Sequence, residues 1–344
     1  SRPPWQRFFI ITGGVLVNFI LALIIYIMVL FTWGKEYLPT RNLTYGVACE
    51  PIAIEMGFKN GDKIVYVDGK EVEDFQQVAP EIVLERAKTV TVNRDGQNID
   101  IPIAEDVIPK LLKSPRLFSI RFPLTIGVVA DNSPAQSAGI EVGDRLMAIN
   151  HAEAIYFDQL VDAVRSNKNQ TVVFTFEREG NPVDIEVFVP EEGLIGVGPA
   201  DLSEIFEVKK VNYTFLQSIP AGIKLGVSTL SGYLKQLRLL FSRSTKAYES
   251  LGGFITIGSI FPGTWDWQSF WMLTALISII LAIMNILPIP ALDGGHMVFI
   301  LYEMISGRKP GEKFMEYAQV AGMIFILALL IFANANDIVR LFNR

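Results

Sequence analysis

The stretch that decides the fold of this chain follows an apolar run, and it reads Asn285-Ile286-Leu287-Pro288-Ile289-Pro290-Ala291-Leu292-Asp293-Gly294-Gly295-His296. Pro288 and Pro290 each lack a backbone N–H donor and disfavour helix in the residue ahead, so we expect extended backbone from Leu287 to about Leu292. Residues 268–287 are apolar enough to cross a bilayer, which places this break at membrane depth. Irregular backbone is tolerated there only where it is buried in protein or lines a wet cavity.

Asp293 is the ionisable residue that follows the two prolines, and an ionisable residue within the membrane is a functional candidate by default. The residue alone leaves two interpretations open. It is a helix N-cap, since Asp ahead of a helical pattern is a good start signal, or it is a metal ligand or proton carrier. His296 is either a polar lining residue in the first helical turn or a further ligand. These two side chains do not complete a zinc site, which needs three protein ligands.

The composition indicates a membrane protein with a soluble part. Of the 344 residues, 50% are hydrophobic and 19% are charged, and the length allows two or three domains. The net charge of -6 argues against nucleic acid as a partner. A single cysteine, Cys49, excludes an internal disulfide and Cys-rich zinc sites.

Three apolar runs predict a membrane-spanning core with the lipid bilayer around it. They cover residues 8–33, residues 268–287 and a segment within 311–333. Each is long enough to cross a bilayer, although a buried core helix is the alternative for the first run. Arg2 and Arg7 precede the first run, and the loop 307–313 before the third run is basic, so both are expected in the cytoplasm. The middle of the chain and its C terminus are then expected on the extracytoplasmic side.

Between residues 44 and 190 the chain contains a duplicated module. The repeat pairs Gly57 with Gly139, Gly61 with Gly143, Asp62 with Asp144, Phe75 with Phe157, Arg94 with Arg178 and Gly96 with Gly180. Each copy is expected to hold short strands and one helix, near residues 73–87 in the first copy and 157–167 in the second.

The phrase Ser-Pro-Ala-Gln-Ser-Ala-Gly-Ile-Glu-Val-Gly-Asp-Arg-Leu, residues 133–146, resembles the signature of PDZ domains in their circularly permuted bacterial form. The resemblance implies two α/β PDZ domains, over residues 44–107 and 118–190. PDZ domains bind peptides by strand addition, while amides of a Gly-containing loop hold the terminal carboxylate. Those loops are expected at Gly46 and Val47 in the first domain and at Gly127 and Val128 in the second. Two readings stay open: grooves that bind peptide tails, or domains that form only a rigid cover.

Residues 191–250 are expected to form a linker followed by an amphipathic helix. Apolar residues recur every three or four positions, the period of one helix face, at Leu216, Ile219, Ile223, Val227, Leu230, Leu234, Leu237 and Phe241. Basic residues lie off this stripe, which is typical of a helix lying flat in the membrane interface. Docking of the helix onto the PDZ pair is the alternative.

The last region, residues 251–344, opens with a β-branched run between glycines, which predicts a short strand before the second span. The run contains Gly253, Phe254, Ile255, Thr256 and Ile257. An exposed strand edge there could accept a substrate chain as an added strand, and a plain connecting strand fits the residues equally well.

The pattern of the opening stretch, Asn-x-x-Pro-x-Pro-x-Leu-Asp-Gly-Gly-His, resembles the motif of the site-2 protease family of intramembrane zinc metalloproteases. The order of span, PDZ pair, amphipathic helix, span, motif and span resembles this family over nearly the whole chain. The expected fold is a mixed membrane protein, with an α-helical core of three spans, the first within residues 1–43, and two PDZ domains. The resemblance implies Zn²⁺ as cofactor and Asp293 as its third protein ligand. It assigns substrate contacts to Asn285, Pro288, Pro290 and the strand at 252–257.

The family takes its other two zinc ligands and its catalytic Glu from a His-Glu-x-x-His helix, and residues 1–344 contain no such motif. The two histidines present are His151 and His296. We therefore expect the given chain to be a fragment, or to lack the first span of the family, and to hold no catalytic residue of its own. A natural pseudoprotease is the alternative.

The resemblance implies a zinc metalloendopeptidase of the bacterial inner membrane that cleaves single-span membrane proteins. Its substrates would be anti-sigma factors already trimmed on the extracytoplasmic side, or remnant signal peptides, with the PDZ pair acting as a size filter. Two other classes stay open: a non-catalytic membrane scaffold that presents PDZ grooves, and a transporter or proton relay built on Asp293. The relay lacks the additional intramembrane charges that such a path usually has.

Overall fold

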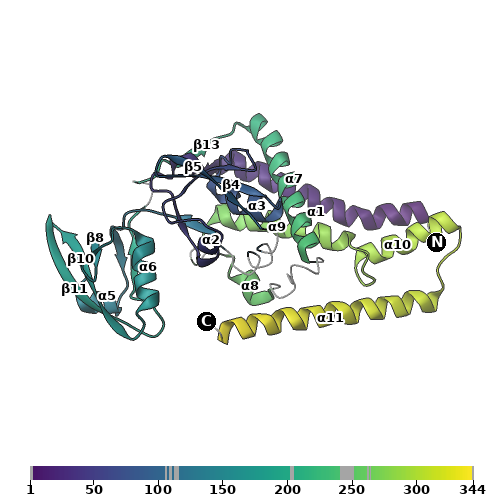
Figure 1. The fold of residues 1–344 in the computed structure, drawn as a ribbon. Helices are drawn as coiled ribbons and strands as arrows, with labels where there is room; N and C mark the ends of the chain where they lie inside the picture. The colour runs from purple at the N-terminus through teal and green to yellow at the C-terminus, as the bar shows by residue number, and fades with distance from the viewer. Residues whose placement is uncertain are drawn as a thin grey trace. The chain divides into compact units, whose positions relative to one another are not determined.

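The computed structural model describes residues 3–342, apart from 105–106, 108–110, 112–115, 202–204, 241–251, 262 and 264. The chain divides into two compact units. We name them the helical unit, Ser1–Lys35 with Lys210–Arg344, and the module unit, Glu36–Lys209. The chain passes from one unit to the other at β1 (Lys35–Tyr37) and returns at β13 (Lys209–Val211) (Figure 1).

Three helices of the helical unit are long and apolar enough to cross a membrane. They are α1 (Pro4–Trp33), α9 (Trp267–Ile286) and, within α11 (Glu312–Phe342), the segment Glu312–Val339. The three predicted spans are therefore present as helices of sufficient length and apolar composition. α1 begins with Pro4, whose fixed φ suits a first helical turn where no N–H is needed. It ends at Gly34, whose φ of 77° suits glycine and whose N–H donates to the Leu30 carbonyl.

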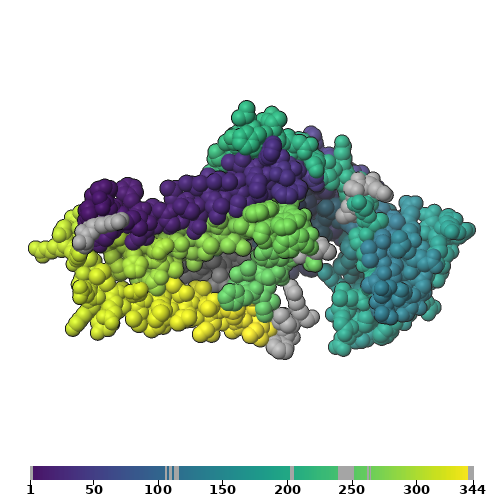
Figure 2. All heavy atoms as spheres, turned by 180° about the vertical axis from the view of Figure 1, so that it is seen from behind, coloured from purple at the N-terminus to yellow at the C-terminus, as the bar shows by residue number. Residues whose placement is uncertain are grey.

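The core of the helical unit lies between α1 and α9. The buried side chains are Ala22, Ile25, Tyr26 and Val29 of α1 with Ala275, Ile279 and Ile283 of α9. Alanines at this contact let the two backbones approach closely. The Ser278 hydroxyl donates to the Asn18 carbonyl at 2.8 Å, so the serine satisfies its polar group within the helix pair. Figure 2 shows α1, in purple, lying alongside the green α9.

The predicted amphipathic helix forms as α7 (Phe215–Leu240). Its buried face differs from the predicted apolar stripe, because Ser218, Gly222 and Gly226 face inward. A Cβ on Gly222 would lie 2.6 Å from Ile27 of α1, so small residues permit this contact. Four residues of the stripe stay exposed: Leu216, Ile223, Val227 and Leu234. Figure 1 shows α7 crossing α1, which fits a helix lying in the plane of the interface. Phe241 lies outside the described residues.

The predicted strand at Gly253–Ile257 is wrong, because these residues belong to the short helix α8 (Phe254–Gly258) and its N-cap, Gly253. A side chain from α11 decides the outcome. The Asp337 carboxylate accepts hydrogen bonds from the N–H groups of Gly253 and Thr256 at 2.9 and 3.0 Å. Since the first N–H groups of a helix have no partner inside it, this distant cap stabilises helix in a sequence whose local preference is strand.

The module unit contains two similar series of elements, of which the second has one additional strand, β9 (Ala152–Glu153). The first series follows the short turn η1 (Thr40–Asn42) and comprises β2 (Val47–Cys49), α2 (Pro51–Glu55), β3 (Lys63–Val67), α3 (Phe75–Leu84), β4 (Thr89–Arg94), β5 (Gln97–Pro102) and β6 (Phe118–Ile120). The second comprises β7 (Ile126–Val129), α5 (Pro134–Ala138), β8 (Arg145–Ile149), β9 (Ala152–Glu153), α6 (Phe157–Ser166), β10 (Gln170–Arg178), β11 (Asn181–Val189) and β12 (Val197–Pro199). The helices expected near 73–87 and 157–167 correspond to α3 and α6. The sheets have the orders β3-β4-β5 and β11-β10-β8-β9, with antiparallel neighbours.

The last strand of each series pairs with its first strand. β6 is antiparallel to β2, and β12 is antiparallel to β7. The boundaries expected from the repeat, 44–107 and 118–190, therefore misplace both closing strands: β6 completes the first module and β12 completes the second. Three-residue strands outside the repeated pattern carry no local signal, and only long-range pairing identifies them.

The repeated Asp and Arg positions form one buried ion pair in each module. Arg94 donates to Asp62 at 2.7 Å from both Nε and Nη2, and Arg178 donates to Asp144 at 2.8 and 2.7 Å. Both carboxylates are 1% exposed. Burial alone would raise the pKa of Asp144, but hydrogen bonds from Arg178 and the Glu141 N–H hold that pKa below its ordinary value. These repeated residues therefore have a structural role.

Candidate functional site

Asp293 is the first residue of α10 (Asp293–Ser306), and the N-cap position belongs to Leu292. The N-cap interpretation of Asp293 is therefore wrong. Its side chain is exposed and forms no hydrogen bond or ion pair with any residue that the structure describes. A free carboxylate at this position is available as a ligand donor.

The backbone before Asp293 is not helical from Leu287 to Leu292, as the prolines predict. It turns rather than running extended, because the Ile289 N–H donates to the Leu287 carbonyl and the Leu292 N–H donates to the Ile289 carbonyl. Ala291 has a φ of 110°, a conformation that L residues rarely adopt. Such strain persists only where neighbouring structure enforces it, and it clusters at functional sites.

Glycines hold the first turn of α10 against this loop. A Cβ on Gly294 would lie 2.6 Å from the Ile286 carbonyl oxygen, and one on Gly295 would lie 2.6 Å from that of Ile289. Gly322 of α11 packs still more closely on the Pro290 carbonyl. The Asp-Gly-Gly sequence is therefore required by close backbone approach, and this packing fixes where Asp293 emerges.

The residues predicted to contact substrate lie in two places. Asn285 stands in the last turn of α9, half-buried, and its side-chain amide has no partner among the described residues. Pro288 is exposed and Pro290 is half-buried in the loop. Gly253–Ile257, in contrast, form the N-cap and body of α8, so they offer no strand edge, and the N–H groups of Gly253 and Thr256 already bind Asp337. Strand addition at that segment is not supported.

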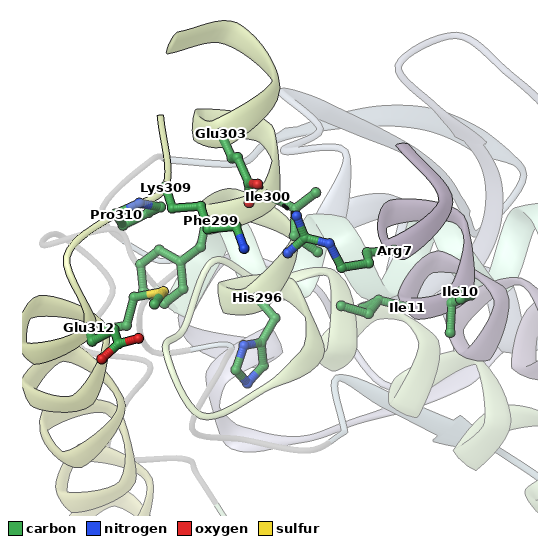
Figure 3. Close-up of a pocket in the computed structure, with 11 residues that line it drawn as sticks. Arg7, Ile10, Ile11, His296, Phe299, Ile300, Glu303, Lys309, Pro310 and Glu312 are labelled. Carbon is green, nitrogen blue, oxygen red and sulfur yellow. Dashed lines mark hydrogen bonds and ion pairs between the residues drawn. The ribbon is translucent and has the colours of Figure 1, made fainter. Parts of the chain in front are cut away.

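His296 lines a cavity of about 500 Å³ between the start of α1, α10 and the start of α11 (Figure 3). The Arg7 guanidinium donates to the Glu303 carboxylate at 2.7 Å across this cavity. The ring of His296 meets Phe299 edge-on, with 6.4 Å between centroids. Asp293 is not among the lining residues, so the geometry agrees with His296 as a polar lining residue.

The described residues do not by themselves fit a zinc ion. Among them no group of three or more His, Cys, Asp or Glu side chains is close enough to hold a metal. Asp293 offers one oxygen donor, whereas a zinc site requires three protein ligands. The described residues therefore supply one of the three protein ligands that a zinc site needs.

In the first module, the two amides expected to hold a peptide carboxylate are already hydrogen-bonded within the protein. The Gly46 N–H donates to the Leu43 carbonyl, and the Val47 N–H donates to the Asp62 carbonyl at 2.9 Å. Gly127 and Val128 lie inside β7, where Val128 pairs with Gly198 of β12. The assignment of Gly46 and Val47 is therefore wrong, and at Gly127 and Val128 the structure has a paired strand in place of the expected loop.

A different loop has free amides. Leu194, Ile195 and Gly196 present N–H groups with no partner among the described residues. The loop is flanked by Gly193 and Gly196, with φ of 69° and 81°. Successive unpaired amides form a concavity that binds anions. The sequence pattern alone predicts a linker at this loop. The close spacing of Gly193 and Gly196 is the sequence feature that could have identified it as a binding loop.

One family model and three relatives each match most of the chain. A family model described as Peptidase family M50 matches residues 1–329. The regulator of sigma E protease of Haemophilus influenzae is 28% identical over 367 residues, covering 99% of this chain and 80% of the relative. The regulator of sigma-E protease RseP of Escherichia coli is 28% identical over 362 residues, covering 98% and 79%. A Neisseria meningitidis relative named as a zinc metalloprotease is 28% identical over 364 residues, covering 99% and 80%.

Proposed function

The chain belongs to peptidase family M50, the site-2 proteases, and from this premise we propose that Asp293 is one protein ligand of the zinc ion of an intramembrane metalloprotease. One observation carries the proposal: a free, exposed carboxylate in the first turn of α10, at the end of a strained loop between two apolar helices. When bound, zinc supplies Lewis acidity and lowers the pKa of its water. Asn285, with its unpaired amide, is proposed to hydrogen-bond substrate backbone.

The remaining two ligands and the catalytic Glu are proposed to lie on a His-Glu-x-x-His helix outside residues 1–344. The donor count supports this, because Asp293 alone cannot retain zinc. The two modules are proposed to be PDZ domains in an extracytoplasmic position, with α1 starting on the cytoplasmic side of a bacterial inner membrane. The basic residues Arg7, Arg308 and Lys309 at one end of the spans support this orientation.

The proposed substrates are single-span membrane proteins reduced to a short extracytoplasmic stub, such as trimmed anti-sigma factors or remnant signal peptides. The module unit is proposed to exclude longer ectodomains. The module unit can be replaced by a short linker, because the chain leaves the helical unit and re-enters it at neighbouring positions. A Cβ on Gly34 would lie 2.6 Å from the Val211 carbonyl oxygen.

We expect the protein carrying the His-Glu-x-x-His helix to cleave a stub and to leave uncut a substrate with the same span and a folded ectodomain. Replacing residues 36–209 with a short Gly-Ser linker should allow cleavage of both, because the excluding bulk is gone. Gel analysis of both substrates in reconstituted vesicles measures this. A control protein carries the same linker inserted after residue 209 and should still discriminate. If the deletion variant cuts the stub but still spares the long substrate, the filter proposal is wrong.

The second module is proposed to bind peptide C termini at the loop of Leu194, Ile195 and Gly196, beside β12. β12 pairs with β7 on one edge, and its other edge pairs with no described strand, so a peptide can add there. The free amides would then receive the terminal carboxylate.

Gly196→Ala should weaken binding of a peptide with a free C terminus roughly tenfold, since strain and crowding of about 1–3 kcal/mol displace the loop. The new Cβ would crowd Ser133, and φ at this position is 81°. Gly180→Ala is the matched control, because it shares positive φ of 80° but has open space around it. Fluorescence titration with free and amidated peptides measures the effect. Equal affinity for the amidated peptide would exclude a carboxylate site.

A further inference from the structure

The polar groups at the start of α8 are satisfied by side chains of α11. Asp337 accepts the N–H of Gly253 and of Thr256 at 2.9 and 3.0 Å, and also the Thr256 hydroxyl. Asn334 accepts the N–H of Phe254 at 3.3 Å. The Asp337 side chain is buried, with its residue 3% exposed. Three N–H groups at this helix start are therefore bonded to protein rather than to water.

The large side chains exposed on α8 and on the turn that follows it are apolar, and the exposed Ser259 hydroxyl between them donates to the Thr256 carbonyl at 2.8 Å. The apolar side chains are Phe254, Ile255, Ile257, Ile260 and Phe261, each between 41% and 67% exposed. From residue 252 to residue 292 the sequence has one ionisable side chain, Asp266. A contiguous apolar patch on a soluble surface is costly and unusual, so this patch indicates a partner.

The position of α8 along the helices identifies that partner. Asn334 and Asp337 belong to the last turns of the candidate span Glu312–Val339, and the next candidate span starts at Trp267. Trp265 and Trp267 are exposed directly before and at that start, as in an interfacial aromatic belt. α8 therefore lies beside the end of one span and shortly before the start of another.

We propose that α8 is a re-entrant element whose exposed face, Phe254, Ile257 and Ile260, contacts lipid acyl chains inside the bilayer boundary. Non-spanning backbone can enter a bilayer only where its polar groups are bonded to protein, and Asp337 meets this condition. The occupant is lipid rather than a protein partner, because α8 packs on α11 beside the exposed apolar side chains of that candidate span, and the patch carries no charge. This inference does not depend on the proteolytic function.

Nitroxide labels test the depth of α8. In a Cys49→Ser background, Ile257→Cys and Ile260→Cys are labelled and reconstituted in phosphatidylethanolamine–phosphatidylglycerol vesicles. Relaxation by dissolved oxygen, which partitions into lipid, is compared with relaxation by a water-soluble nickel complex. Leu281→Cys, on the exposed face of α9, is the lipid reference, and Val142→Cys, exposed before β8, is the water reference.

Labels at 257 and 260 are expected to match Leu281, with high oxygen relaxation and loss of nickel relaxation. Nickel relaxation equal to that at Val142 would overturn the proposal, and so would low relaxation by both agents, which indicates cover by protein. In the presence of Asp337→Ala the label at 257 should gain nickel relaxation, because the uncapped helix leaves the bilayer. Asp337→Asn retains one acceptor oxygen and should show a smaller gain. Unchanged nickel relaxation of the label at 257 in Asp337→Ala would overturn the part of the proposal in which the Asp337 cap lets α8 enter the bilayer.

Discussion

Replacing Asp293 with alanine is expected to lower cleavage of a membrane stub by more than about 100-fold in the protein that carries the His-Glu-x-x-His helix. Loss of a residue that only supports a metal ligand already costs about 10–100-fold, and loss of a ligand itself costs more. The substitution breaks no packing, because the side chain is exposed and has no partner among the described residues. Cleavage rate and zinc retained after dialysis against a chelator measure the effect.

Glu312→Ala is the matched control for that substitution. Glu312 is also an exposed acid in the first turn of a helix, so both changes remove the same modest dipole contribution of about 0.3–1 kcal/mol. The control should keep zinc and activity. Asp293→Glu should retain part of the zinc but lose rate, because the longer side chain moves the donor oxygen. Normal zinc content and normal cleavage in Asp293→Ala would contradict the ligand assignment.

Asp144→Ala is expected to destabilise the second module by about 1.5–3 kcal/mol, because it removes the charge-assisted hydrogen bonds between Arg178 and a buried carboxylate while Arg178 keeps its bonds to Glu141 and the Gly139 carbonyl. The pair is bidentate and Asp144 is 1% exposed. Hydrogen exchange of β8, β10 and β11 amides in the intact protein measures the loss. Asp184→Ala is the control, since its bond to Thr175 is exposed and should contribute about 0.5–1.5 kcal/mol. Unchanged exchange in Asp144→Ala would contradict the structural role.

The same pair predicts a pH dependence of the second module. The pKa of Asp144 is lower in the folded state than its ordinary value of about 3.9. Its contribution to stability is therefore fully present above that ordinary pKa and is lost as the pH falls through the folded-state pKa. Amide protection measured from pH 6 downward should fall below about pH 4 in the wild type, and this component should be missing in Asp144→Ala.

Several features followed from the sequence because their signals are local. The apolar runs are long enough to identify three candidate spans, and the match to Peptidase family M50 confirms the resemblance that rested on Asn285–His296. Pro288 and Pro290 act on their immediate neighbours, so the end of α9 was predictable. The duplication was visible in the spacing of glycines and in the two Asp–Arg pairs.

The amides of Gly46 and Val47 show where local patterns fail. A glycine-containing loop resembles a carboxylate site in sequence, but strand pairing decides whether its N–H groups are free. Among the described residues, unpaired amides occur at Leu194, Ile195 and Gly196, directly before β12, whose partner strand β7 lies far earlier in the chain. No local pattern reports the state of a hydrogen bond formed over that separation.

The sequence by itself determined the helical spans, the break at the prolines and the acid that follows them, since each depends on residues within one helix length. Tertiary structure alone decided that Gly253–Ile257 belong to a helix and its cap, because Asp337, 81 residues after Thr256, satisfies the N–H groups at its start. It also decided that Asp293 is free rather than a cap. Close packing of Gly294, Gly295 and Gly322 on the loop fixes the backbone at that residue, and the contact of Gly322 with Pro290 arises only because distant helices meet.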